Sequence, residues 1–141
     1  MQELSSFTPP PSSAVGAEHF LTDGTRAVLR ITRCRNCASS WFPARAQCSN
    51  CASWEVDEAV TSSVGIAYAS TVVRVGPRQF HPPYTLAYVD VDGVRLLAHA
   101  TSADALVPGS PVDLIFARIG NGDDGAMMSY AVAASASAGA R

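Results

Sequence analysis

Hydrophobic and polar positions divide the chain into two parts with different patterns. In the first part, residues 27–32 alternate apolar and mixed side chains, which predicts a strand. From about residue 56 onward, β-branched and aromatic residues recur in short runs that also predict strands: 61–75, 84–91, 94–101, 112–117 and 126–132. About five strands with no strong helix between them indicate a small closed barrel, and an OB-fold barrel fits this length.

Turn residues separate these strands. Asp92-Gly93 lies between two of the runs and is the strongest hairpin signal in the chain. The proline-rich stretch 76–83 predicts a loop, and turns are expected at 108–111 and 121–125. Gly65 interrupts the longest run, so we expect a bend or a bulge there.

The N-terminal segment has a different composition. Residues 1–12 are rich in proline and serine and predict a flexible arm. Ser12 or Ser13 is expected to cap a short helix that runs through Asp23 and stops at Gly24. Because an isolated helix of this length is unstable in water, its apolar side chains must pack against the rest of the molecule.

Four cysteines form the most specific motif. They have the spacing C-x2-C-x10-C-x2-C and lie at Cys34, Cys37, Cys48 and Cys51. Each C-x2-C step can fold into a knuckle that presents two sulfurs to one ion, and two knuckles can surround a tetrahedral zinc at about 2.3 Å. Four thiolates leave no position open for water, so this zinc is expected to be structural. Two disulfides, or a rubredoxin-like iron site that carries electrons, are the alternatives.

Aromatic side chains flank the cysteines. We expect Trp54 to cover a metal site that is too small to have its own core, whereas Trp41 and Phe42 suit either that role or contact with a partner. The predicted fold is mainly β, with an N-terminal helix and a rubredoxin-like zinc ribbon followed by a five-stranded OB-fold barrel. The expected organisation is a flexible arm (1–12), the helix and ribbon (13–55), the barrel (56–134) and a flexible tail (135–141).

Composition narrows the class of protein. Apolar residues make up 48% and charged residues 16% of the 141 positions, which is enough apolar material for a core. No apolar run approaches the ~20 residues of a membrane span, and the start of the chain lacks the features of a secretory signal. These observations predict a cytoplasmic protein without a membrane partner, whose cysteines stay reduced.

Charge is unevenly distributed along the chain. Residues 24–54 hold five arginines and no acid, whereas 56–134 hold four arginines and eight acids. An OB barrel that binds single-stranded nucleic acid stacks bases on aromatic side chains, for which Tyr68, Tyr84 and Tyr88 are available. It also needs positive charge to neutralise phosphates. The negative barrel therefore disfavours a nucleic-acid partner, although this function remains the alternative.

No catalytic constellation is evident. Once all four cysteines are metal ligands, no thiol is left as a nucleophile, and the three histidines, His19, His81 and His99, are scattered. The chain has no Gly-x-Ser-x-Gly elbow, phosphate-binding glycine loop or His-Glu-x-x-His pair. We therefore expect no catalytic residues in this chain by itself.

The order of these features resembles a known family. A helix, a four-cysteine ribbon containing Trp41-Phe42-Pro43-Ala44-Arg45 and an OB barrel are similar to the zinc-ribbon/OB-fold proteins associated with acyl-CoA metabolism. The similarity continues through 64–73, 83–84 and 106–112, and it covers about 14–132. Ala38 and Ala52 depart from the family, which usually has glycine after each knuckle, where a left-handed backbone is often needed.

This resemblance implies an accessory subunit. Members of the family pair with thiolase-like enzymes in complexes that act on acyl-CoA thioesters, as thiolases, acyltransferases or retro-aldolases, some of them in steroid side-chain degradation. The catalytic groups of those complexes belong to the partner. By resemblance, this chain would stabilise a thiolase-like partner and help to bind the CoA thioester. The expected contacts with CoA or the partner are Arg35 and Arg45, whose forks suit phosphate, together with Trp41 and Phe42.

Overall fold

Regular structure in this protein is almost entirely β. The computed structural model describes residues 4–102 and 104–135, and within them it has nine strands and three short 3-10 turns. The turns are η1 (Leu4–Ser6), η2 (Ala17–His19) and η3 (Arg78–Phe80). The strands are β1 (Phe20–Thr22), β2 (Ala27–Cys34), β3 (Ser40–Trp41), β4 (Val56–Val60), β5 (Val64–Val73), β6 (Tyr84–Val91), β7 (Val94–Ala100), β8 (Pro111–Gly122) and β9 (Gly125–Ala134).

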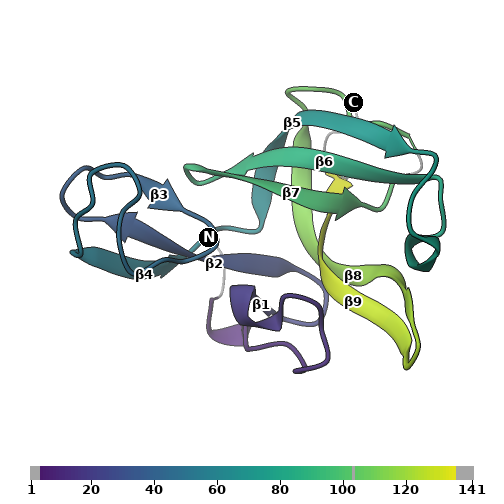
Figure 1. Ribbon diagram of the computed structural model, residues 1–141, viewed down its shortest axis with the longest axis horizontal. Helices are drawn as coiled ribbons and strands as arrows, with labels where there is room; N and C mark the ends of the chain where they lie inside the picture. The colour runs from purple at the N-terminus through teal and green to yellow at the C-terminus, as the bar shows by residue number, and fades with distance from the viewer. Residues whose placement is uncertain (1–3, 103, 136–141) are drawn as a thin grey trace.

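One long strand, β2, organises the N-terminal half. Its first residues pair with β1, and its last residues pair with both β3 and β4, all antiparallel. Figure 1 shows β2 running from beneath the barrel into the ribbon that projects to the left. Val28, Leu29 and Ile31 are at most 1% exposed, so the apolar run that predicted this strand is buried.

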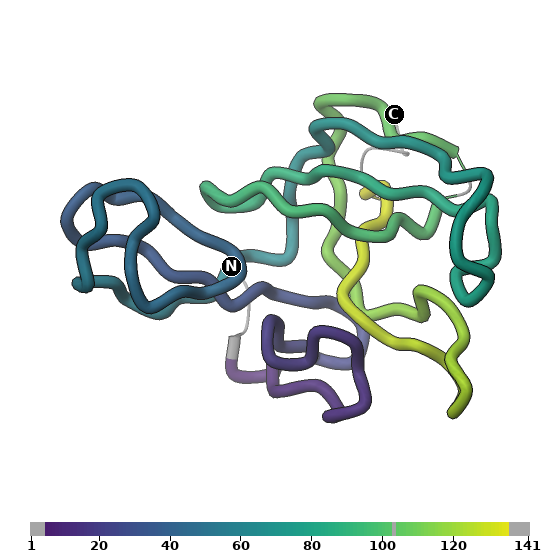
Figure 2. The backbone as a smooth tube through the Cα atoms, in the orientation of Figure 1, coloured from purple at the N-terminus to yellow at the C-terminus, as the bar shows by residue number. Residues whose placement is uncertain are grey.

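The C-terminal half is the five-stranded closed barrel that the sequence predicts. Its strands follow the order β5-β6-β7-β9-β8, and β5 pairs with β8 to close it. All neighbours are antiparallel except β7 and β9, which are parallel. Alternate residues of β6, from Thr85 to Val91, point inward and are buried, as the period of a half-buried strand requires. Figure 2 follows the chain through the barrel into the long β8–β9 hairpin.

Two glycine predictions have different outcomes. The hairpin at Asp92-Gly93 is confirmed, because both residues have positive φ, 46° and 88°, as a two-residue type I′ turn requires. The bulge expected at Gly65 is wrong, because the register shifts between Ala67 and Ala69 instead. A Cβ at Gly65 would lie 2.6 Å from a methyl of Val91, so this glycine permits the close approach of β6.

The predicted N-terminal helix is wrong, and no α-helix occurs among the described residues. Gly16 has a left-handed backbone, with φ 70°, which interrupts the expected helix. Phe20 then enters β1 and is 0% exposed, with its ring packed against Phe116 and Tyr130. Pairing with β2 therefore overrides the local helical preference of this short segment.

The module boundaries also differ from expectation. β4 pairs with β2 along five residues, so it belongs to the ribbon sheet, and the chain enters the barrel after residue 60 rather than at 56. In the expected flexible arm, Phe7 is 6% exposed and Thr8 exchanges two backbone hydrogen bonds of 2.9 Å with Thr22. The expected tail lies outside the described residues, apart from Ser135.

Ribbon and barrel share one core. A single buried cluster joins Phe20, Leu29 and Ile31 of the N-terminal half to Val89, Val112 and other inward residues of the barrel. The β6–β7 hairpin also contacts the ribbon, since the Arg33 guanidinium of β2 donates to the Asp92 carbonyl at 3.4 Å. The Asp92 carboxylate accepts a 2.6 Å hydrogen bond from the amide of Ser62, in the link between β4 and β5. The hairpin tip extends toward the ribbon in Figure 2. The two halves are therefore fixed relative to each other.

In the part of the chain that the structure describes, no helix has the length and apolar character needed to cross a bilayer.

Truncation of Phe20 tests the shared core. Phe20→Ala should lower the free energy of unfolding by about 3–5 kcal/mol, because it leaves a cavity between β1 and the β8–β9 hairpin. Chemical denaturation followed by far-UV circular dichroism and by tryptophan fluorescence should show one coincident transition, since both tryptophans lie in the ribbon. Val75→Ala, at a position 93% exposed, is the control and should change stability little. Separate transitions for the two signals would contradict a shared core.

Candidate metal centre

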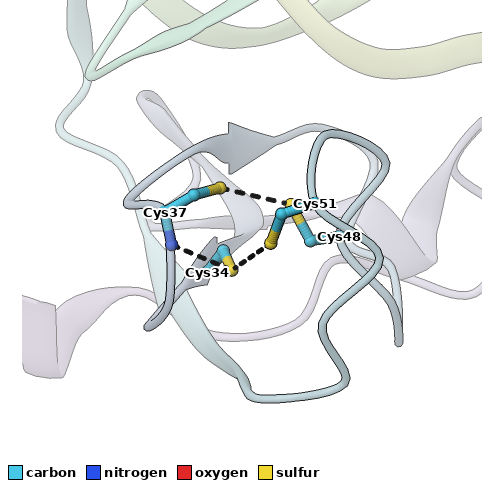
Figure 3. Close-up of side chains that lie close together, drawn as sticks. All are labelled: Cys34, Cys37, Cys48 and Cys51. Atoms are coloured by element: carbon cyan, nitrogen blue, oxygen red, sulfur yellow. Dashed lines mark hydrogen bonds between the residues drawn. The ribbon is translucent and has the colours of Figure 1, made fainter.

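The structure brings the four cysteine sulfurs together at the end of the ribbon (Figure 3). All four lie within 4.8 Å of one another. The Cys34 and Cys51 sulfurs are 3.6 Å apart, and so are those of Cys37 and Cys48. Sulfurs placed tetrahedrally at about 2.3 Å from one ion would be about 3.8 Å apart, so the cluster is compatible with zinc. Four free thiols facing one point fit a metal site better than two disulfides.

Each pair of cysteines sits in a tight knuckle. The Ala38 amide donates to the Cys34 carbonyl at 2.9 Å, and the Ala52 amide donates to the Cys48 carbonyl at 3.0 Å. Both alanines have φ 66°, in the left-handed region. The knuckles therefore have the backbone that favours glycine at this position, and this chain adopts it with alanine.

Two asparagines link the knuckles through the sulfurs. The Asn36 side-chain amide donates to Cys51 at 3.4 Å, and the Asn50 side-chain amide donates to Cys37 at 3.5 Å. Their backbone amides each donate at 3.3 Å to the first sulfur of their own knuckle. The cysteine spacing alone does not indicate these two asparagines, but the repeated hexapeptides CRNCAS and CSNCAS, identical at five of six positions, carry the signal.

Hydrogen-bond donors favour the thiolate form of two of the four cysteines, Cys37 and Cys48. The hydroxyl of Ser39, followed by the side chain of Asn50, lowers the pKa of Cys37 to about 5. Burial acts to raise the pKa of Cys48, but donors that include the Trp41 indole lower it overall. Thiolate is the form that binds metal. Donors of this kind also spread the negative charge that four thiolates would place around one ion.

The flanking aromatic residues take roles that differ in part from the sequence-based expectation. Trp54 is 70% exposed, so the expectation that it covers the metal site is wrong. Trp41 is half-buried and its indole N–H donates to the Cys48 sulfur at 3.4 Å. Trp41, rather than Trp54, therefore lies against the cysteine cluster. Phe42 packs edge-on against His19 and Tyr130, at 6.0 and 5.8 Å between ring centroids, and so joins the ribbon to the barrel.

The two arginines singled out from the sequence lie on the ribbon surface. Arg35 pairs with Asp57, at 3.3 Å between nitrogen and oxygen, and both side chains are more than half exposed. The guanidinium of Arg45 stacks over Trp41, 4.9 Å from the ring centroid, and also donates to the Ser49 hydroxyl. Each guanidinium therefore has a partner within the chain, but both side chains remain open to solvent.

A second candidate surface covers the outer face of β5, β6 and β7. We define this apolar face by Ile66, Tyr68, Tyr88 and Leu97, which are 46–52% exposed. Tyr88 and Leu97 are direct cross-strand partners on β6 and β7, and they border a shallow depression of about 340 Å³. Arg95 lies at the edge, 3.5 Å from the Tyr68 ring centroid and hydrogen-bonded to Asp90 at 2.6 and 3.0 Å. Sequence pattern alone could not show that these side chains point outward together.

Comparisons with known proteins give two informative matches. A relative from Methanocaldococcus jannaschii, described as a DUF35 domain-containing scaffold protein, is 33% identical over 107 residues, which cover 71% of this chain and 76% of the relative. A solved structure described as an Ltp2-ChsH2(DUF35) aldolase aligns with TM-score 0.60 and 24% identity, covering 75% of this chain and 84% of that chain. At this level of identity, the match to the solved structure shows a similarity of fold alone. No family model matches the chain.

Replacement of the two knuckle alanines tests the left-handed backbone. Ala38→Gly and Ala52→Gly should each raise the free energy of unfolding by about 0.5–1 kcal/mol, because glycine removes the Cβ strain at φ 66°. Ala126→Gly, in the exposed part of β9, is the matched control and should lower stability by about 0.5–1 kcal/mol. Denaturant unfolding of the metal-loaded protein measures all three. Destabilisation by both knuckle variants would contradict the strained geometry.

The two tryptophans provide a matched test of the sulfur environment. Trp41→Phe removes an N–H donor to Cys48 and should weaken Zn²⁺ binding about tenfold. Trp54→Phe makes the same chemical change at an exposed position and should leave the affinity unchanged. Competition with a chromophoric chelator measures both affinities. Equal losses in the two variants would show that the indole of Trp41 has no specific part in the site.

Proposed function

The chain belongs to the DUF35 domain family, and from this premise we propose that it is a non-catalytic accessory subunit of a thiolase-like complex that processes acyl-CoA thioesters. The M. jannaschii relative is described as a scaffold protein, and the solved neighbour is described as an aldolase whose name joins Ltp2 to a DUF35 chain. The first description supports a role in assembly, and the second supports an enzyme partner. We propose that this partner is a thiolase, an acyltransferase or an aldolase.

The observation that carries the proposal is the apolar face of the barrel. Tyr68, Tyr88 and Leu97 leave about half of their side chains in water, on adjacent strands of a rigid sheet. Contiguous exposed apolar surface on a small protein marks an interaction site. Tyrosine at the centre of such a surface is a typical anchor in protein interfaces. We therefore place the partner subunit on this face.

The cysteine cluster supports a non-catalytic role. All four thiols face one point, so a bound metal ion would use every cysteine of the chain. We propose that this ion is zinc and that it is structural, because four thiolates leave no coordination position for a substrate. The nucleophile of the complex would then come from the partner. Reduced thiols at this site also fit a cytoplasmic location.

The ribbon is the proposed place of contact with CoA or with an adjoining part of the partner. Arg35 and Arg45 are exposed, and their ion pair and stacking contacts are of the weak, exchangeable surface kind. A phosphate could therefore replace Asp57 as the partner of Arg35 at little cost. Trp41 would hold Arg45 in place, and Phe42 would fix the ribbon against the barrel rather than enter the contact directly.

Binding of single-stranded nucleic acid is the alternative. The exposed Tyr68 and Tyr88 resemble a stacking platform. However, Arg95 on the same face is already paired with Asp90, which leaves its charge neutralised. Since phosphate neutralisation dominates such affinity, this face suits a protein partner better.

Co-purification with a partner tests the proposal. Co-expression with a thiolase-like protein encoded by a neighbouring gene should yield a stable complex, and Tyr88→Glu should weaken it at least about tenfold by placing a charge in the interface. Val75→Glu introduces the same charge at a position 93% exposed, away from the apolar face, and should leave the complex intact. Binding is measured with purified chains by calorimetry, after circular dichroism shows that both variants are folded. A Tyr88→Glu chain that binds as well as wild type would contradict this docking face.

A further inference from the structure

The barrel has an open mouth at the end where β6 begins and β7 finishes. A cavity of about 310 Å³ lies there, and its lining includes Tyr84, Thr85, His99, Ala100, Arg118 and Ala131. Barrel mouths are common sites for small ligands. Ala100 and Ala131 have small side chains, which leave room inside the rim. The cavity lies apart from the cysteine cluster and from the residues that define the apolar face.

An unpartnered hydroxyl lies at the inner wall of this cavity. Thr85 is 1% exposed and points into the barrel, and its Oγ1 has no hydrogen-bond partner. Buried polar groups in folded proteins nearly always have a partner, because leaving one unpaired is costly. A hydrogen-bonding group that enters through the mouth would satisfy this hydroxyl.

An arginine stands at the rim of the same cavity. Arg118 is exposed and makes no ion pair among residues 4–102 and 104–135. A register shift between Arg118 and Gly120 places two consecutive residues, Arg118 and Ile119, on the lining. Bulges of this kind re-aim side chains next to functional sites. A side chain at Gly120 would collide with the Gln79 carbonyl, so η3 packs directly against this bulge.

Aromatic rings form one wall. The His99 and Tyr84 rings line the cavity. They form a cluster with Phe80, in which His99 is 4.6 Å from Phe80 and 5.3 Å from Tyr84 between ring centroids, and Phe80 is 5.5 Å from Tyr84. Burial lowers the pKa of His99, which favours the neutral form of the ring. This wall adds no charge of its own, and the guanidinium of Arg118 is the charge at the rim.

We propose that the barrel mouth binds a small hydroxy- or oxo-carboxylate, with its carboxylate on Arg118 and its hydroxyl or carbonyl oxygen on Thr85. One arginine matches a single negative charge and the planar shape of a carboxylate. The small cavity and the alanines beside Thr85 restrict the ligand to a short chain. This site goes beyond the proposed function, since it needs neither the partner nor the metal.

The test uses the full chain and a series of ω-hydroxy acids, from 3-hydroxypropionate to 6-hydroxyhexanoate, each compared with the alkanoate of equal chain length. Two-dimensional NMR should show millimolar or tighter binding, with shifts centred on residues 84–85, 99–100 and 118. One hydroxy acid should bind at least about tenfold tighter than its alkanoate. Thr85→Val should abolish this preference, and Arg118→Gln should weaken both acids about tenfold. Arg74→Gln, at an exposed arginine outside the cavity, should change neither.

Three results would overturn the proposal. The first is that no acid in the series binds to the folded wild-type chain. Another is a Thr85→Val variant that keeps the preference for the hydroxy acid. The third is stabilisation of the ligand-free protein by Thr85→Val without any effect on ligand binding, which would mean that the hydroxyl is merely unpaired and belongs to no binding site. Because the assay uses the isolated chain, failure of partner binding does not affect its outcome.

Discussion

Burial of β2 against the barrel is the interaction on which the rest of this structure depends. Leu29 and Ile31 lie in the same core as the inward side chains of β6 and β8, while the far end of the same strand supplies Cys34. One continuous strand therefore sets the orientation of the cysteine cluster relative to the barrel. β4 and the Asp92 turn reinforce this arrangement from the other side. A chain with only 141 residues gains a larger common core in this way than two separate modules would have.

Sequence reasoning succeeded where local chemistry decides the structure. The cysteine spacing indicated the cluster, and Asp92-Gly93 indicated a hairpin, because only a few backbone geometries suit these residues. It failed where contacts distant in sequence decide. The segment containing Phe20 forms a strand because β2 lies beside it, and Trp54 is exposed because Trp41 occupies the place next to the sulfurs. Neither outcome is encoded in the local pattern.

The candidate sites also divide into those that local sequence predicts and those that depend on the folded structure. The four sulfurs could be assigned from spacing alone, whereas the outward side chains Tyr68, Tyr88 and Leu97 come from strands whose register had to be known. The barrel mouth could be found only once the closure of the barrel was known as well, because Thr85 and Arg118 are 33 positions apart in the sequence and line the same cavity. The cysteine cluster, the apolar face and the mouth therefore occupy separate parts of the molecule, so each can be altered without direct disturbance of the others.

The repeated hexapeptide of the ribbon has an evolutionary and structural consequence. The two copies are related by approximate local symmetry, and each asparagine donates to a sulfur of the opposite copy. Neither copy is complete alone, since half of its sulfur environment comes from its counterpart. Duplication of one short segment would thus generate both the ligand set and the hydrogen bonds that support it.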